Sequence, residues 1–271
     1  MSVRVDLLET ADVVREVGPR AGGSAVLVCC AGLDGNARLK REQSATMLDE
    51  NVRITSSILR LALHWHIPDV VVVSSAEVYS GSCSGLITED SAYSGWSEPS
   101  ANGYVLSKVY SELLALSRGA QHGIRVYCPR PTNLYGPGDD APGEFQRVIP
   151  SMIGQARTGQ DIELWGDGTQ RRSFMFVEDM VRGVLAVVRH HLAGPVNIGV
   201  HDDISIADLA NLILLVFGGT GRVRVRTSAP TGTRGRSLDL RKLESVIDFK
   251  PRSLNQGLYH MRDALSGRLD G

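Results

Sequence analysis

The sequence predicts an α/β protein with a doubly wound, Rossmann-like parallel sheet, and three observations support this fold class. Apolar runs at 25–30 and 70–73 contain valines without any alternation, which is typical of strands buried on both faces. A stretch with helical spacing separates them, and a second helix and a third strand follow. Strands and helices therefore alternate as they do in a parallel sheet covered by helices.

The two expected helices each join neighbouring strands. The first runs roughly from Met47 to His66, and the second runs roughly from Tyr104 to Arg118 before the strand Ile124–Cys128. Apolar residues of the first helix recur at helical spacing and form one buried face: Ile54, Ile58, Leu61 and Trp65.

The texture of the chain changes after Pro131, where glycine and proline become dense over 135–143. We expect a Rossmann-like domain over residues 1–135, to which about 174–200 return. Residues 136–173 and 201–271 are expected to form a smaller, mostly C-terminal lobe.

Composition excludes several classes of protein. The 271 residues carry a net charge of -1, whereas nucleic-acid binding through phosphate neutralisation favours a clearly basic surface. No apolar run approaches the roughly 20 residues of a membrane span, and the first residues lack a signal-peptide pattern. The cysteines show no CxxC spacing, which favours reduced thiols and a cytoplasmic location: Cys29, Cys30, Cys83 and Cys128.

Candidate catalytic residues follow the valine strand. Ser75 and Glu77 lie at its carboxyl end, the edge where open α/β sheets bind ligands. Tyr104 and Lys108 are one helical turn apart, so an ammonium can stabilise a phenolate and make tyrosine a usable acid or base. A Tyr-x-x-x-Lys pair alone is common and also fits a packed tyrosine beside a surface lysine; its place after Ser75 favours catalysis.

These residues and three later segments resemble the extended short-chain dehydrogenase/reductases, the group that contains nucleotide-sugar epimerases, dehydratases and reductases. The resemblance is strongest to the GDP-fucose synthases and covers nearly the whole chain. The later segments are Arg130–Pro137, Trp165–Phe174 and Val177–Asp179.

The resemblance implies roles for individual positions. Ser75, Tyr104 and Lys108 correspond to the catalytic triad. A nucleotide-sugar pocket is implied at Asn133, Arg147, Val148, Trp165, Arg172 and Arg236. Guanidinium groups suit a diphosphate because they bind phosphate oxygens bidentately. The alternative interpretation is that these arginines form ion pairs on the protein surface. The two expected helices correspond to those that form a dimeric four-helix bundle in the family, so we expect a homodimer.

The sequence also departs from the family. It has no Gly-x-x-Gly-x-x-Gly turn near its start, and Val3–Leu8 and Val26–Gly32 resemble the third and fourth strands of the family's sheet. We therefore expect a truncated sheet in which 3–7 pairs directly with 26–30. Such pairing would block the site at which the family binds its dinucleotide and make NAD(P) binding unlikely.

Two further positions differ from GDP-fucose synthase. Glu77 and Arg147 stand where that enzyme has its epimerising cysteine and histidine, and arginine cannot act as a base at neutral pH. Glu77 resembles the glutamate of the dehydratases, with Ala76 where an adjacent acid is common.

The leading hypothesis is therefore an isomerase that works without nicotinamide or flavin. It resembles the metal-dependent GDP-sugar mutases of nucleoside-antibiotic pathways and would interconvert the pyranose and furanose forms of a GDP-hexose. Mg²⁺ or Mn²⁺ would assist the diphosphate together with Arg172 and Arg236, while Tyr104 or Glu77 deprotonates the sugar. No protein ligand to the metal is assigned, since Asp139, Asp140 and Glu144 fit solvated loop acids.

Two alternatives stay open. One is an NAD(P)-dependent epimerase/reductase of a GDP-4-keto-6-deoxyhexose, favoured by the complete Ser75, Tyr104 and Lys108 set. The other is a pseudoenzyme that binds a sugar nucleotide without catalysis. In each case the expected partner is a nucleotide sugar, with neither nucleic acid nor membrane involved.

Overall fold

A computed structural model of the chain describes residues 7–8, 26–79, 85–93, 102–139, 147–226 and 237–267. The chain divides into two compact units. Unit 1 comprises Met1–Ser80, Glu89–Arg130 and Val184–Asn197, and unit 2 comprises Gly81–Thr88, Pro131–Gly183 and Ile198–Gly271. The α/β fold class predicted from the sequence is confirmed.

Unit 1 is built on a four-stranded sheet in the order β1-β2-β4-β9. β1 pairs with β2 and β2 pairs with β4, both in parallel, so the apolar runs of the sequence are neighbouring strands. The strands are β1 Val26–Cys29, β2 Asp69–Val72, β4 Arg125–Pro131 and β9 Gly194–Ile198. The expected strand at 3–7 falls almost entirely on residues 1–6, which lie outside the described part of the chain.

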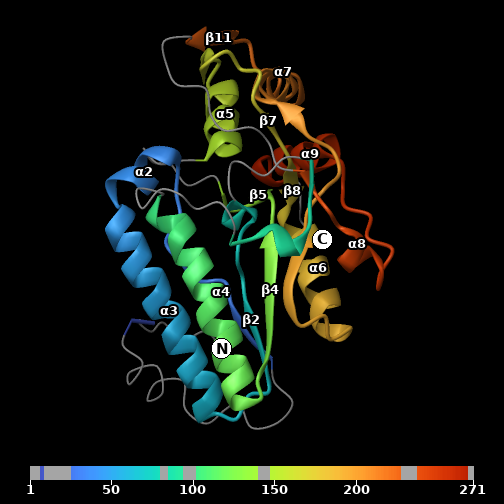
Figure 1. The fold of residues 1–271 in the computed structure, drawn as a ribbon. Helices are drawn as coiled ribbons and strands as arrows, with labels where there is room; N and C mark the ends of the chain where they lie inside the picture. The colour runs from blue at the N-terminus through green and yellow to red at the C-terminus, as the bar shows by residue number, and fades with distance from the viewer. Residues whose placement is uncertain are drawn as a thin grey trace. The chain divides into compact units, whose positions relative to one another are not determined.

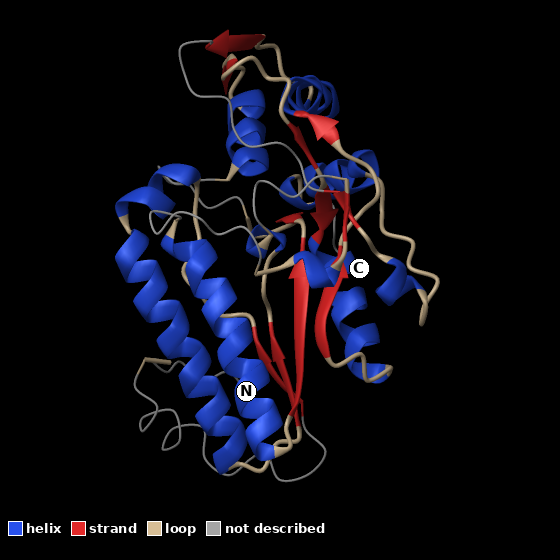
Figure 2. Cartoon of the chain, in the orientation of Figure 1, coloured by secondary structure: helices blue, strands red, loops and turns tan. Residues whose placement is uncertain are grey.

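Two long helices, α3 (Ser44–His64) and α4 (Gly103–His122), cover one face of this sheet (Figure 1). Ile58 and Leu61 of α3 and Ala115 of α4 share a buried core with Val70 and Val126 of the strands. Burying this apolar face is what holds the helices on the sheet. Helices and strands of the unit are distinguished by colour in Figure 2.

Buried polar contacts fix α3 against α4. The Asn51 side-chain amide donates to Ser107 Oγ at 3.0 Å, and Thr55 Oγ1 donates to Ser111 Oγ at 2.9 Å. The remaining elements of unit 1 are short: α2 Ala37–Glu42 and the 3-10 turns η1 Ala76–Val78 and η2 Glu89–Ser91.

Unit 2 consists of small strand pairs and helices around a second apolar core. β3 pairs with β12, β5 with β8 and β6 with β11, all in parallel, while β7 pairs with β10 in antiparallel. Its strands are β3 Leu86–Ile87, β5 Asn133–Tyr135, β6 Ile162–Trp165, β7 Arg171–Arg172, β8 Phe174–Phe176, β10 Ile204–Ser205, β11 Val223–Arg226 and β12 Ser237–Leu238. Its helices are α5 Val148–Arg157, α7 Ile206–Phe217, α8 Arg241–Glu244 and α9 Leu254–Leu265, and α6 Val177–Arg189 belongs to both units.

No helix in the described ranges combines the length and the apolar character that crossing a membrane requires.

Candidate active site

The end of β2 positions Ser75. The chain leaves the strand after Val72 and enters η1, with Ser75 in extended conformation as the capping residue. Ser75 Oγ accepts a hydrogen bond from the Glu77 backbone amide at 3.1 Å. The cap holds the serine at the carboxyl end of a central parallel strand, which is the edge where open α/β sheets bind ligands.

The first turn of α4 positions Tyr104. Asn102 caps this helix, because its side-chain oxygen accepts from the backbone amides of Tyr104 and Val105 at 3.0 and 3.4 Å. The Tyr104 side chain is buried, and the backbone carbonyl of the same residue accepts a hydrogen bond from Ser107 Oγ at 2.7 Å. The tyrosine therefore sits on a backbone that is fixed at both its amide and its carbonyl.

Lys108 lies one turn further along the same helix. Its ammonium is 5.7 Å from the centroid of the Tyr104 ring and donates to the Val73 carbonyl at 2.9 Å. Burial lowers the pKa of the Lys108 ammonium, and the neighbouring Cys29 and Asp34 side chains offset part of this effect. The lysine thus joins α4 to the end of β2 beside the tyrosine.

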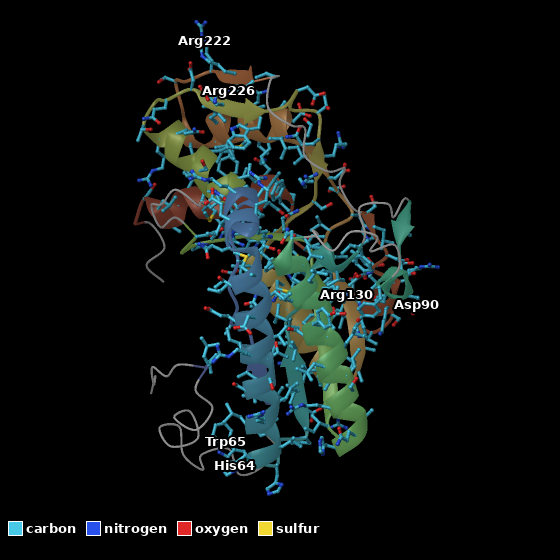
Figure 3. All side chains as sticks on the ribbon, turned by 60° about the vertical axis from the view of Figure 1, so that its left-hand side comes forward. His64, Trp65, Asp90, Arg130, Arg222 and Arg226 are labelled. Atoms are coloured by element: carbon cyan, nitrogen blue, oxygen red, sulfur yellow. The ribbon has the colours of Figure 1, made fainter. Side chains whose placement is uncertain are left out.

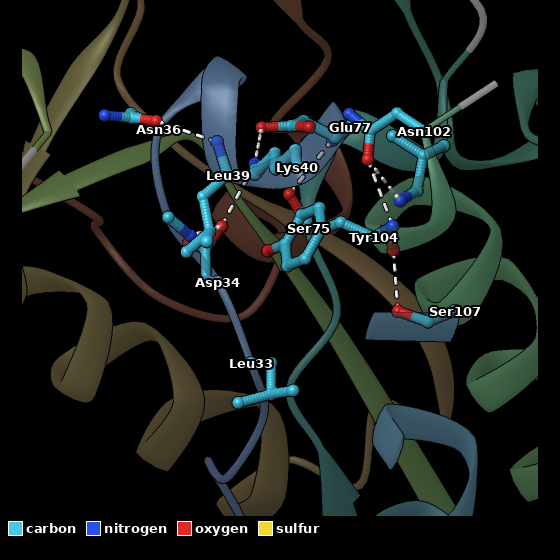
Figure 4. A network of polar contacts seen from close by, with 12 residues as sticks. Leu33, Asp34, Asn36, Leu39, Lys40, Ser75, Glu77, Asn102, Tyr104 and Ser107 are labelled. Atoms are coloured by element: carbon cyan, nitrogen blue, oxygen red, sulfur yellow. Dashed lines mark hydrogen bonds and ion pairs between the residues drawn. The ribbon is translucent and has the colours of Figure 1, made fainter. Parts of the chain in front are cut away.

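Lys40 belongs to the same cluster, although the sequence pattern does not single it out. It lies on α2, only 8% exposed, with its ammonium 3.8 Å from the centroid of the Tyr104 ring. The same ammonium pairs with Glu77 at 2.8 Å and with Asp34 at 3.0 Å (Figure 4). Its position in the highly charged segment 38–42 resembles that of a surface lysine, so the sequence contains no spacing that would reveal these partners.

The loop after β1 is fixed against α3 and α4. The Asn51 side chain accepts from the Leu33 amide at 2.6 Å and donates to the Leu33 carbonyl at 3.0 Å. A Cβ on Gly32 would lie 3.2 Å from the Asn51 side-chain oxygen and 3.8 Å from the Lys108 ammonium. The loop backbone therefore packs tightly on the Asn51 side chain and lies beside the Lys108 ammonium, because Gly32 has no side chain.

The implied substrate residues that lie in the described ranges all belong to unit 2. Asn133 starts β5 and donates to the Ser173 carbonyl at 3.0 Å. Trp165 ends β6 with an exposed indole, and Arg172 lies in β7 with one guanidinium nitrogen donating to the Arg171 carbonyl.

Two neighbouring positions occupy the start of α5. Val148 is its first residue, and Arg147 precedes it and pairs with Asp139 at 2.8 Å. Arg236 lies outside the described residues, as do Asp140 and Glu144.

A metal centre receives no support from the part of the chain that the structure describes. Nowhere in those ranges do three or more His, Cys, Asp or Glu side chains form a group that could hold a metal ion. The expected Mg²⁺ or Mn²⁺ requirement therefore has no structural counterpart there.

The sheet with a Ser, Tyr and Lys set at its carboxyl edge defines an extended short-chain dehydrogenase/reductase. Residues 2–199 match the NAD dependent epimerase/dehydratase family, and the chain belongs to that family.

Two curated relatives and two solved structures give this assignment detail. The chain is 40% identical over 256 residues to a dTDP-4-dehydro-6-deoxy-D-allose reductase of Streptomyces sp, covering 94% of this chain and 78% of the relative. It is 28% identical over 229 residues to the GDP-L-fucose synthase of Escherichia coli (strain K12), covering 79% and 71%.

Epimerase Mth375 of Methanothermobacter thermautotrophicus matches the fold with a TM-score of 0.87 at 22% identity, covering 98% of this chain and 78% of that one. MlghC, a GDP-mannoheptose C4 reductase of Campylobacter jejuni with NADP bound, matches with a TM-score of 0.80 at 20% identity, covering 96% and 86%.

These comparisons overturn four expectations. The metal-assisted pyranose/furanose mutase, the isomerase class, the divalent-metal requirement and the exclusion of NAD(P) are wrong, because the family is NAD dependent and the relatives are named as reductases and synthases. The expectation rested on the absent glycine turn and on direct pairing of 3–7 with 26–30, whereas Ser75, Tyr104 and Lys108 form a set suited to proton transfer coupled to hydride transfer. A nucleotide sugar as the substrate class is supported, whereas GDP specifically is not.

Proposed function

We propose that the protein is an NAD(P)H-dependent ketoreductase that acts on a dTDP-linked 4-keto-6-deoxyhexose. The observation that carries the proposal is the 40% identity, over 94% of the chain, to a dTDP-4-dehydro-6-deoxy-D-allose reductase. The second candidate is the GDP-linked epimerase/reductase reaction, which the 28% identical GDP-L-fucose synthase favours.

The described residues fit the reactive end of a nicotinamide dinucleotide. Tyr104 and Lys108 form an acid–cation pair one helical turn apart. A Cβ on Gly32 would lie 3.8 Å from the Lys108 ammonium, so the glycine leaves space beside that lysine. No glycine-rich strand–turn–helix occurs in the described ranges, so the residues that hold the pyrophosphate are not assigned. When bound, a reduced nicotinamide supplies the hydride.

Each residue of the set has a distinct task in ketone reduction. Tyr104 is the proton donor to the carbonyl oxygen, since a phenol beside two ammonium groups can release its proton at low cost. Lys108 compensates the phenolate that remains, and its bond to the Val73 carbonyl keeps the ammonium in place. Ser75 offers a second hydroxyl that orients the carbonyl oxygen.

The contacts of two other residues favour reduction over epimerisation. Glu77 pairs with Lys40, and Arg147 pairs with Asp139. Glu77 and Arg147 replace the cysteine and the histidine that GDP-fucose synthase uses to epimerise, and an arginine cannot deprotonate a sugar carbon at neutral pH. The pocket residues of unit 2 remain proposals for nucleotide-sugar binding: Asn133, Arg147, Val148, Trp165, Arg172 and Arg236.

The test combines binding with turnover. NADPH and NADH are titrated calorimetrically, and oxidation of each is followed with dTDP-4-dehydro-6-deoxy-D-allose and with a GDP-linked 4-keto-6-deoxyhexose. We expect oxidation that is faster with the dTDP sugar. Tyr104→Phe should lower kcat by about 10² to 10⁴, while Tyr110→Phe, an exposed tyrosine on the same helix, should not.

Three results would contradict the proposal or change it. Absence of both dinucleotide binding and turnover would reject a reductase. Faster turnover of the GDP sugar, with inversion at a ring carbon, would support the second candidate instead. Full activity of Tyr104→Phe would reject the assigned proton donor.

A further inference from the structure

Lys40 is a buried cation that the proposed reaction does not yet use. Its ammonium lies among three groups from three different elements: the Asp34 carboxylate at 3.0 Å, the Glu77 carboxylate at 2.8 Å and the Tyr104 ring at 3.8 Å to the centroid. Burying a lysine is costly unless its charge is paired, and two carboxylates pair it here. The position on the face of the tyrosine is therefore a fixed feature of the fold.

We propose that Lys40 is a positioning residue that sets the acidity of Tyr104 and holds Glu77 beside it. The inference rests on the proposed function, in which Tyr104 donates the proton. A cation on the face of the ring favours the phenolate, because the negative charge of a phenolate spreads into the ring.

The sign of the effect follows from the charges around Tyr104. Among the residues that the structure describes, two ammonium groups face it, Lys40 from α2 and Lys108 from α4, and two carboxylates lie with them, Asp34 after β1 and Glu77 in η1. Of the two cations, Lys40 is nearer to the ring. Replacing Lys40 with an uncharged residue removes one cation and takes the ion-pair partner from both carboxylates, and each change disfavours the phenolate.

The same contacts give Lys40 a mechanical role. Through Asp34 and Glu77 the ammonium joins the loop after β1 to the turn that carries Ser75. Glu77 is 37 residues from Lys40 along the chain, so this ion pair is a tertiary constraint on the serine cap. Loss of the cation should loosen both Glu77 and the loop, in addition to its effect on acidity.

The first test needs neither cofactor nor substrate. The ultraviolet absorbance of tyrosinate is titrated for the wild type and for Tyr104→Phe, and the difference gives the pKa of Tyr104. Lys40→Met, measured with and without Tyr104→Phe, should raise that pKa by about one unit, a tenfold fall in phenolate at fixed pH. Lys40→Arg should restore most of the shift, and Arg41→Met, an exposed cation on the same helix, should leave the pKa unchanged.

The second test measures kinetics of the loaded enzyme. Lys40→Met should lower kcat about tenfold with KM for the sugar changed less than about twofold, and its high-pH limb should move upward with the pKa of Tyr104. Lys40→Arg should recover most of kcat. A purely structural lysine would instead lower the unfolding midpoint without moving the pH profile.

The outcomes separate the two proposals. An unchanged or lowered pKa of Tyr104 in Lys40→Met overturns the role of Lys40, whether or not the wild type is a reductase. A raised pKa in a protein without reductase activity supports the electrostatic coupling and rejects the proposed function. Should Lys40→Met not fold, Glu77→Gln replaces it: removing a carboxylate should lower the pKa of Tyr104, and a rise would overturn the inference.

Discussion

Arg130, which is labelled in Figure 3, is fully buried. Its guanidinium nitrogen atoms donate to several acceptors within unit 1. It donates to both carboxylate oxygens of buried Glu112 at 2.9 and 2.7 Å and to Tyr79 Oη at 2.9 Å. Burial raises the pKa of Tyr79 to about 12, so the phenol stays protonated and donates onward to the Asn197 side chain. The network links α4, β4 and β9 in the centre of the unit.

Removing one charge of this pair should cost far more stability than removing both. Glu112→Gln leaves a buried guanidinium without its counter-ion and should lower the free energy of unfolding by about 3–5 kcal/mol. The double variant Arg130→Met/Glu112→Leu should recover most of that loss, because no uncompensated charge remains. Urea unfolding of each variant measures the difference.

The matched control for this prediction is an exposed ion pair. Arg38 and Glu42 lie one turn apart on α2 with both side chains half-exposed, so Glu42→Ala should change the free energy of unfolding by about 0.5 kcal/mol or less. Equal losses for Glu42→Ala and Glu112→Gln would show that burial of the Arg130 pair carries no special cost.

At the scale of elements, the start of α4 depends on a glycine. A Cβ on Gly103 would lie 1.8 Å from the Ser44 carbonyl oxygen at the start of α3, and that atom is backbone. The Gly103 amide also donates to Ser44 Oγ at 2.8 Å. Gly103→Ala should therefore push the two helices apart, cost about 1–3 kcal/mol and displace the adjacent Tyr104, lowering kcat.

A second helical glycine supplies the opposite expectation. A Cβ on Gly154 in α5 would meet nothing within 4 Å, so Gly154→Ala should raise the free energy of unfolding by up to about 1 kcal/mol through helix propensity. Thermal and urea unfolding of both variants give the comparison. A stabilised Gly103→Ala protein would mean that α3 and α4 have room to separate at no cost.

The elements that the sequence predicts well are those whose pattern is local. The sequence predicts a helix over Met47–His66, and α3 spans Ser44–His64, because its apolar residues repeat every turn and bury one face. α2 is not predictable in this way, because its six residues are mostly polar and lack a repeating apolar face. Tertiary contacts hold α2 in place: Lys40 pairs with Asp34 and Glu77, and Leu39 packs against a buried cluster that includes Tyr104.

Within the candidate site, too, the residues placed by local spacing were predictable and the cofactor was not. Tyr104 and Lys108 are predictable as neighbours because helical spacing alone places them together, and Ser75 because strand ends share one sheet edge. The prediction for the cofactor was wrong because the absent glycine turn and the strand pairing expected from it are local features, whereas family membership is spread over many positions. The match over residues 2–199 combines all of those positions.

At the scale of the whole molecule, the homodimer expected from the α3 and α4 segments stays a prediction, and an exposed apolar face on α4 supports it. Tyr110 is 55% exposed and Leu113 is 42% exposed, and their spacing places them on one side of the helix. Since a two-fold interface uses the same face of both copies, these two side chains would meet their counterparts across the axis. Burying them accounts for large apolar residues at positions that would otherwise contact water.

Light scattering after size exclusion, over a range of protein concentrations, measures the assembly directly. The wild type should have the mass of a dimer, and Tyr110→Arg/Leu113→Arg should weaken dimerisation at least about thirtyfold, the effect of losing an interface hot spot of ~2 kcal/mol. Leu215→Arg is the control, since Leu215 is 76% exposed on α7 in unit 2 and its change should leave the mass unaltered. A monomeric wild type would reject the dimer, whereas a dimer that survives the double substitution would place the interface on a different face.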